Sequence, residues 1–177
     1  MNKVIFLDID GVLNTKWLYT QMDKNTPRDK YGYAFDPNAV ANLKRIIDET
    51  GAEIVISSSW KSFGLTELID MWQERNLPGL IIGITPNSVS DELLLHADLD
   101  NMEIFHIRGE EIKEWLLRHG KEVSNYVIID DVDNMLPEQQ NHFVQTNPET
   151  GITEDIALLA IMTLNNAEYD KENNGYS

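Results

Sequence analysis

Two aspartates at the end of an apolar run could carry out acid–base or nucleophilic chemistry. The run is "KVIFLDIDGVLNT" (residues 3–15), in which Asp8 and Asp10 stand two residues apart. Alternate residues of a strand share a face, so the two carboxylates would repel each other if the strand continued. If the strand instead ends at Asp8 and the chain turns through Gly11, both acids lie at the carboxyl end of the strand, where parallel sheets collect their ligands.

A second acidic run ends another apolar stretch. Asp130 and Asp131 close "YVIIDD", and Asp133 follows. In a doubly wound sheet ordered 3-2-1-4-5, the first and fourth strands are neighbours, so the two acidic strand ends face each other across one crevice. Carboxylates crowded together require a cation, and Mg²⁺ prefers oxygen ligands and accepts one or two carboxylates together with water and substrate phosphate. We therefore predict an Mg²⁺ site formed by Asp8, Asp10, Asp130 and Asp131.

Other interpretations of the acidic runs are weaker. An aspartate at a single strand end usually caps a helix or a turn, but two such ends at corresponding positions favour a functional site. The "IIDD" run also resembles the acidic strand of nucleotide-binding ATPases, yet the chain has no GxxxxGK[ST] loop. The histidines show no metal-ligand spacing and are interpreted as surface or structural residues; they are His96, His106, His119 and His142.

Phosphoryl transfer would also need hydroxyl and cationic partners. The second apolar run ends in "ISSSWK", whose hydroxyls at a strand end can donate hydrogen bonds to phosphate oxygens. A cation should balance the charge of the transferring phosphate. Arg108, at the start of "RGEEIKEWL", is our first candidate, and Lys61 and Lys113 are the alternatives.

The composition is that of a globular protein with a strong negative charge. Hydrophobic residues make up 42% of the 177 residues, and the formal net charge is −16. This charge disfavours nonspecific binding to nucleic acid. No apolar run approaches the roughly 20 residues of a membrane helix, and "VIFL" is too short for a signal-peptide core. The chain has no cysteine, and we expect a cytoplasmic protein without membrane contact.

Short apolar runs alternate with helical patterns along the chain. The runs are continuous, as expected for strands that are covered on both faces. We therefore predict an α/β fold: a doubly wound, Rossmann-like parallel sheet of order 3-2-1-4-5 with helices on both faces. The expected strands cover residues 4–9, 52–57, 80–85, 126–130 and 142–146, and the expected helices 36–51, 65–76, 109–120 and 153–166. In the first of these helices, Asp36 is the expected N-cap and Gly51 the stop.

Two segments interrupt this alternation. Residues 15–35 and 86–107 are long for connections, and we expect loops or small flaps near the site rather than a large cap. Residues 1–166 then form one domain, and residues 167–177 a flexible tail. The first segment carries aromatic residues that could stack on a base, although packing within a flap is the favoured role; they are Trp17, Tyr19, Tyr31 and Tyr33.

These motifs together resemble the haloacid dehalogenase superfamily of phosphohydrolases. "DIDGVLN", "IVISSSW", a basic residue that opens a helix, and "VIIDD" match in order. The combination of "SSSWK" with "HFVQTNPETGIT" is similar to a narrower branch, the haloacid dehalogenase domain of Swiss Army Knife RNA-repair proteins. The resemblance covers residue 3 to about residue 165.

The resemblance implies a role for each matching residue. Asp8 is the nucleophile that becomes an aspartyl phosphate, and Asp10 is the general acid and then the general base, with its backbone carbonyl on Mg²⁺. Ser57 binds phosphate, with Ser58 as the alternative, and Arg108 stands at the position of the usual Lys or Arg. Asp130 and Asp131 complete the metal site.

The leading hypothesis is thus an Mg²⁺-dependent phosphatase with an aspartyl-phosphate intermediate. Its open site would accept a phosphorylated substrate as large as a nucleic-acid end or a phosphoprotein. The alternatives are a phosphate- or metal-binding regulatory module, such as a receiver-like domain, and a phosphotransferase. Receiver domains lack a second aspartate that acts as general acid, so Asp10 favours turnover. The sequence determines neither the substrate nor the oligomeric state.

Overall fold

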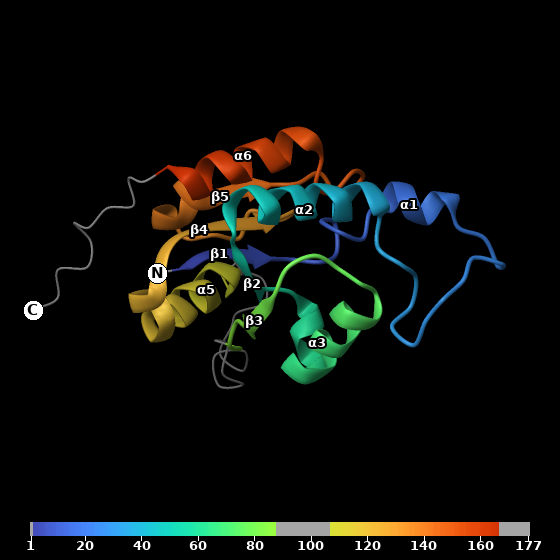
Figure 1. Cartoon of the computed structure of the whole chain (residues 1–177), viewed down its shortest axis with the longest axis horizontal. Helices are drawn as coiled ribbons and strands as arrows, with labels where there is room; N and C mark the ends of the chain where they lie inside the picture. The colour runs from blue at the N-terminus through green and yellow to red at the C-terminus, as the bar shows by residue number, and fades with distance from the viewer. Residues whose placement is uncertain (1, 88–106, 167–177) are drawn as a thin grey trace, which may run out of the picture.

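The described part of the chain forms one parallel β-sheet with helices on both sides (Figure 1). The computed structural model describes residues 2–87 and 107–166. The sheet order is β3-β2-β1-β4-β5, so the predicted order 3-2-1-4-5 and the predicted α/β class are confirmed. The strands are β1 (Asn2–Leu7), β2 (Glu53–Ile56), β3 (Ile81–Ile84), β4 (Val123–Asp130) and β5 (Phe143–Gln145).

Two layers of helices enclose the sheet. In Figure 1, α2 and α6 lie above the strands and α5 lies below them. None of the described helices is long and apolar enough to cross a membrane. The α-helices are α1 (Lys16–Gln21), α2 (Pro37–Thr50), α3 (Leu65–Glu74), α5 (Ile107–His119) and α6 (Glu154–Asn165), and the 3₁₀-helices are η1 (Ser59–Phe63), η2 (Gly120–Glu122) and η3 (Pro137–His142).

The buried part of β1, residues 4–7, shows why the sequence is apolar at successive positions. Ile5 and Leu7 belong to the core on one face of the sheet, which includes residues of α2, α3 and α6. Val4 and Phe6 belong to the core on the other face, where Trp115 of α5 meets the Phe6 ring edge-on at a centroid distance of 5.3 Å. Successive side chains of a strand point to opposite faces, so a strand covered on both faces is apolar throughout.

Local sequence signals locate some element ends better than others. Asp36 caps α2 by accepting a hydrogen bond from the Asn38 amide (2.9 Å), and Gly51 ends the helix with φ +66°, as predicted. Strand β4 begins at Val123 rather than at residue 126, because its first residues still pair with β1. Strand β5 is shorter than the expected 142–146, because His142 still belongs to η3.

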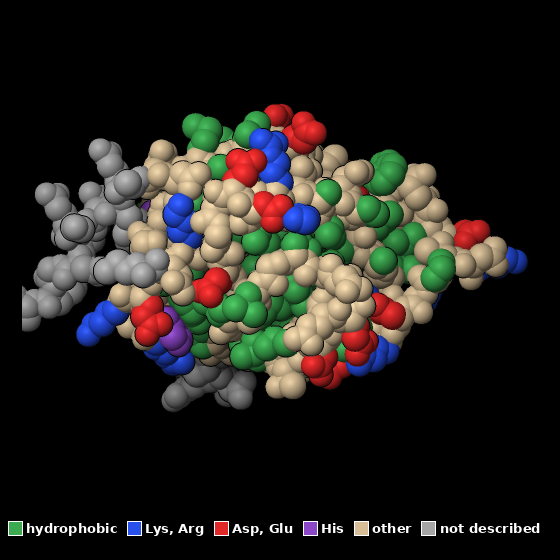
Figure 2. All heavy atoms as spheres, in the orientation of Figure 1, with side chains coloured by type: hydrophobic (Ala, Val, Ile, Leu, Met, Phe, Trp, Pro, Cys, Tyr) green, Lys and Arg blue, Asp and Glu red, His purple; other side chains and the backbone are tan. Residues whose placement is uncertain are grey.

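The first inserted segment is partly helical. Residues 16–21 form α1, a helix that was not expected within the predicted loop or flap over 15–35. Trp17 and Tyr19 on this helix are about half exposed, at 50% and 48%. Hydrophobic side chains gather on the molecular surface in this region (Figure 2). Most of the second segment, 86–107, and the expected tail, 167–177, lie outside the described residues.

A buried arginine fastens the first insert to α3. Arg75 donates hydrogen bonds from Nε and Nη2 to the two carboxylate oxygens of Asp29, at 2.7 and 2.8 Å. Its guanidinium carbon lies 4.6 Å from the centre of the Phe35 ring and 5.7 Å from that of Tyr31. Tyr31 itself packs against the core, and Tyr33 lies beneath the guanidinium of Arg28. Packing therefore accounts for the positions of both tyrosines.

We expect Arg75→Lys to loosen the insert without unfolding the sheet. Lysine keeps the charge but loses both the bidentate hydrogen bonds and the stacking. This loss should lower the free energy that holds the insert in place by about 1–3 kcal/mol. Limited trypsin digestion should then cleave within residues 24–30 faster than in the wild type. Arg45→Lys is the matched control, because Arg45 makes an exposed pair with Glu49 at 2.8 Å. Equal cleavage rates in the two variants would show that Arg75 does not hold the insert.

Candidate active site

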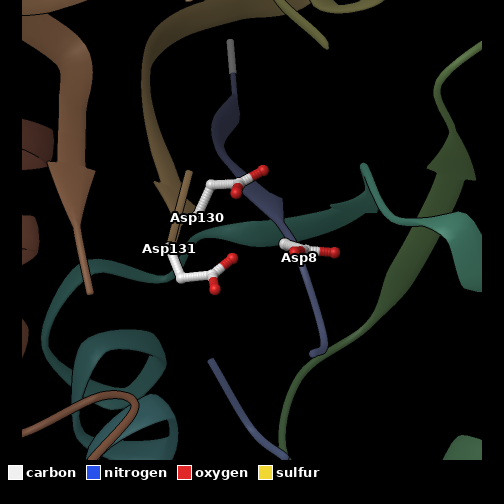
Figure 3. A group of neighbouring side chains, drawn as sticks. All are labelled: Asp8, Asp130 and Asp131. Carbon is white, nitrogen blue, oxygen red and sulfur yellow. The ribbon is translucent and has the colours of Figure 1, made fainter. Parts of the chain in front are cut away.

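Three carboxylates from neighbouring strands meet at the carboxyl end of the sheet. Oxygens of Asp8, Asp130 and Asp131 all lie within 4.8 Å of one another. Asp8 follows β1, Asp130 ends β4, and Asp131 comes next in the chain (Figure 3). Asp8 and Asp130 are buried, and Asp131 is partly exposed. This is the edge at which the two acidic runs were expected to meet.

Strand alternation directs the key side chains toward α5. Asp8 and Asp130 each stand two residues after a side chain of the core on the α5 face, Phe6 and Ile128 respectively. Residues two apart share a face of a strand. Ser57 stands in the same relation to Val55 of β2, which belongs to the same core. The sheet therefore presents three polar groups on the side where α5 begins.

Gly11 permits the close approach of the two acidic runs. Its φ is +74°, as the predicted turn requires, and a Cβ at this position would lie 2.4 Å from the Asp131 carboxylate. Any side chain would collide there, and an L-residue would also be strained at that φ. Just beyond this contact, the Thr146 hydroxyl donates to the Gly11 carbonyl at 2.9 Å, which connects the turn to the end of β5.

Burial makes these acids hard to ionise. Loss of solvent, together with the charge of Asp8, raises the pKa of Asp130 to about 7, although the Arg108 guanidinium acts in the opposite direction. Burial also raises the pKa of Asp8, against the opposing effects of the Arg108 guanidinium and a hydrogen bond from Ser58. Desolvated like charges at short range are unfavourable without a cation among them.

Arg108 is the candidate cation that reaches this group. Its Nε lies 3.4 Å from Oδ2 of Asp130, and its Nη2 lies 3.9 Å from Oδ1 of Asp8. Both distances exceed those of well-formed hydrogen bonds. A guanidinium carries five N–H donors. Arg108 can therefore neutralise the acids and still offer donors to a phosphate.

The other two candidate cations are engaged elsewhere. Lys61 makes a buried ion pair with Glu111 of α5 at 2.6 Å and donates to the Pro86 carbonyl at 3.0 Å. Burial lowers the pKa of Lys61. Lys113 lies 3.4 Å from Glu138 on the surface, with both side chains about half exposed. The ion pair of Lys61 instead ties η1 to the first turns of α5, the helix that carries Arg108.

The two candidate serines differ in their hydrogen bonds. Within the described residues, the Ser57 hydroxyl is buried without a hydrogen-bond partner. Ser58 hydrogen-bonds the Asp8 carboxylate, and its hydroxyl also accepts from the Trp60 amide at 3.4 Å. An unpaired buried hydroxyl costs about 1–3 kcal/mol, which a phosphate oxygen could recover. This difference favours Ser57 as the phosphate partner and Ser58 as a support for Asp8.

Asp10 lies apart from the three clustered carboxylates. Its side chain is exposed and does not belong to the group formed by Asp8, Asp130 and Asp131. The sequence predicted a cluster of four carboxylates, whereas the described part of the chain forms a cluster of three. The turn after Leu7 ends the strand alternation that would have placed Asp10 beside Asp8. The Asp10 carboxylate instead accepts hydrogen bonds from Asn14 and Trp60, each at 2.9 Å.

Comparison with known proteins identifies the family. Residues 4–157 match the model of the haloacid dehalogenase (HAD) domain in Swiss Army Knife RNA repair proteins. The chain belongs to this family. No curated protein matches the chain. The matched residues include every side chain described above, so the HAD assignment made from the sequence motifs is confirmed.

Family membership makes a hydrolase of the phosphatase type the general expectation for this HAD domain. HAD proteins generally use Mg²⁺, and the donor set of this HAD domain suits that ion. The three clustered ligands are carboxylates, which are the hard oxygen donors that Mg²⁺ prefers. A bound divalent cation would also relieve the repulsion that raises the pKa of Asp130.

Proposed function

We propose that this protein is an Mg²⁺-dependent phosphohydrolase that forms an aspartyl phosphate on Asp8. The observation that carries the proposal is the arrangement around Asp8: it has two further carboxylates within 4.8 Å and the Arg108 guanidinium at 3.9 Å. A carboxylate attacks a phosphate dianion only where positive charge offsets the repulsion between them. Arg108 and a metal held by the acids would supply that charge.

The carboxylates of Asp8, Asp130 and Asp131, with the backbone carbonyl of Asp10, would hold the metal. When bound, Mg²⁺ neutralises charge on the nucleophile and on the phosphate. Ser57 and Arg108 would donate hydrogen bonds to the phosphate oxygens and orient the phosphorus toward Asp8.

Two chemical steps complete the reaction. In the first, an Asp8 oxygen attacks phosphorus, the bond to the leaving oxygen breaks, and that oxygen keeps the electron pair and takes a proton from Asp10. In the second, Asp10 accepts a proton from a water molecule as the water attacks phosphorus. The bond between phosphorus and Asp8 then breaks, which releases inorganic phosphate and restores both side chains.

We further propose that the substrate is a large molecule with a terminal phosphate, such as a nucleic-acid end or a phosphoprotein. The name of the matched family refers to RNA repair. The net charge of −16 opposes extended contact with a polyanion, which favours recognition of an end.

A phosphatase assay with metal control tests the proposed activity. EDTA should abolish the hydrolysis of p-nitrophenyl phosphate, and Mg²⁺ should restore it. A panel of phosphorylated oligonucleotides, phosphopeptides and small metabolites would then identify the preferred substrate. Full activity in EDTA would contradict the metal role. Phosphate binding without turnover of any panel member would instead indicate a regulatory module.

A further inference from the structure

Two donors from different segments hold both oxygens of the Asp10 carboxylate. Asn14 donates from Nδ2 to Oδ1, and Trp60 donates from Nε1 to Oδ2, each at 2.9 Å. Asn14 is buried, and its backbone carbonyl accepts from the Gly11 amide at 2.8 Å, so the turn itself fixes its position. Because each oxygen has its own donor, the plane of the carboxylate is set by the protein.

The Trp60 ring is held from two sides. It meets the buried Phe35 ring edge-on at a centroid distance of 5.7 Å and the Phe63 ring at the same distance. The indole belongs to η1, which Ser58 caps. An indole N–H can only donate a hydrogen bond. A donor that packing holds in place can therefore orient the acceptor that it contacts.

We propose that Trp60 is the positioning residue for Asp10, which is an inference that rests on the proposed phosphohydrolase mechanism. Each carboxyl oxygen has two lone-pair directions. The hydrogen bond from Trp60 uses one direction on Oδ2, so the carboxyl group can still exchange a proton with the leaving oxygen or with water. Trp60 thus fixes the orientation in which Asp10 performs both proton transfers, and it does not touch the reacting atoms.

Segment 57–63 contacts Asp8, Asp10 and the helix that carries Arg108. Ser58 hydrogen-bonds Asp8, and Trp60 holds Asp10. Lys61 pairs with Glu111, one helical turn from Arg108 on α5. Of these contacts, that of Trp60 is the one directed at the proton-transferring group, so its loss should affect the proton-transfer steps selectively.

Trp60→Phe removes the N–H and keeps an aromatic ring between Phe35 and Phe63. The free energy of a hydrogen bond to a charged group is large enough that its loss in the transition state would lower a rate constant by about 10- to 100-fold. We expect kcat for an alkyl phosphate, a poor leaving group, to fall by this factor in the presence of Mg²⁺. The initial burst of p-nitrophenol from p-nitrophenyl phosphate should persist, because that leaving group needs little protonation. KM should stay within about twofold.

Trp72→Phe is the matched control. Trp72 is buried, whereas Trp60 is partly buried, and the Nε1 of Trp72 donates to the Pro78 carbonyl at 2.8 Å, away from the acids. Trp72→Phe therefore makes the same chemical change and should alter thermal stability without changing the ratio of alkyl to aryl turnover. Trp60→Gln, whose amide can donate a hydrogen bond, should recover part of the alkyl phosphatase activity that Trp60→Phe loses.

A double-mutant cycle separates positioning from general damage. If Trp60 acts through Asp10, adding Trp60→Phe to Asp10→Asn should change kcat by less than about twofold, because coupled effects are not additive. Full additivity, or an unchanged alkyl-to-aryl ratio in Trp60→Phe, would overturn the inference. A wild-type protein without Mg²⁺-dependent turnover would overturn the proposed function instead, so the two failures are distinguishable.

Discussion

Asp8→Asn should abolish turnover, whereas Asp10→Asn should leave a protein that becomes phosphorylated and then stalls. Asparagine at residue 8 keeps the size of the side chain but removes the attacking oxygen, so we expect a loss of about 10⁴-fold or more. Asparagine at residue 10 leaves the nucleophile and removes the proton donor and base, at a cost of about 10²–10⁴-fold. Both residues come after the last residue of β1 and are not part of the apolar core, so both variants should remain folded.

Rapid mixing with p-nitrophenyl phosphate and Mg²⁺ distinguishes the two variants. Asp10→Asn should show a burst of p-nitrophenol followed by slow turnover, and Asp8→Asn should show neither. Asp133→Asn is the control, because Asp133 is exposed, lies in the same acidic run and hydrogen-bonds Gln140 at 3.0 Å. It should keep near-wild-type activity. Near-normal turnover by Asp8→Asn would contradict the covalent mechanism.

Asp130→Asn should make the metal-free protein more stable at pH 7.5 while it abolishes the response to Mg²⁺. The pKa of Asp130 is raised to about 7 in the folded protein, from an ordinary value of 3.8. The folded state therefore binds this proton more tightly than the unfolded state does. The free energy of unfolding of the metal-free protein consequently falls as the pH rises from about 4 to about 7. Above that range, the loss of stability is complete. Asparagine removes this destabilising charge, and its oxygen can still accept the hydrogen bond that the Val132 amide donates to Asp130 at 2.9 Å.

Thermal unfolding in EDTA and in Mg²⁺ at pH 5 and pH 7.5 tests this expectation. In EDTA, the wild-type melting temperature should fall with rising pH by more than that of Asp130→Asn. Mg²⁺ should raise the wild-type value at pH 7.5 by mass action and leave the variant nearly unchanged. Asp133→Asn should follow the wild type throughout. Parallel pH dependence of wild type and Asp130→Asn in EDTA would show that Asp130 does not cause this loss of stability.

Local patterns in the sequence predicted the sheet and the meeting of the acids. Continuous apolar runs indicated strands covered on both faces, and the order of the sheet then brought Asp8 beside Asp130 and Asp131. The turn at Gly11 was predicted because few other residues adopt a positive φ there. These features depend on neighbours in the chain or on the topology of parallel sheets.

Contacts between distant side chains could not be predicted in the same way. Trp60 meets Asp10 across 50 residues of sequence, and Lys61 meets Glu111 across a similar distance. Neither pair has a spacing that signals a contact. "SSSWK" offered hydroxyls and a lysine as phosphate ligands, but it gave no sign that Lys61 would pair with Glu111 of α5. Helix α1 was missed because its six residues are too few to show a helical period.

The location of the phosphoryl group on the protein tests the proposed covalent mechanism most directly. Asp10→Asn would be mixed with an aryl phosphate and Mg²⁺, quenched in acid, digested, and analysed by peptide mass spectrometry with and without hydroxylamine. We expect a hydroxylamine-sensitive phosphate on the peptide that contains Asp8. Phosphate on another residue, or steady turnover without any phosphorylated peptide, would contradict that mechanism.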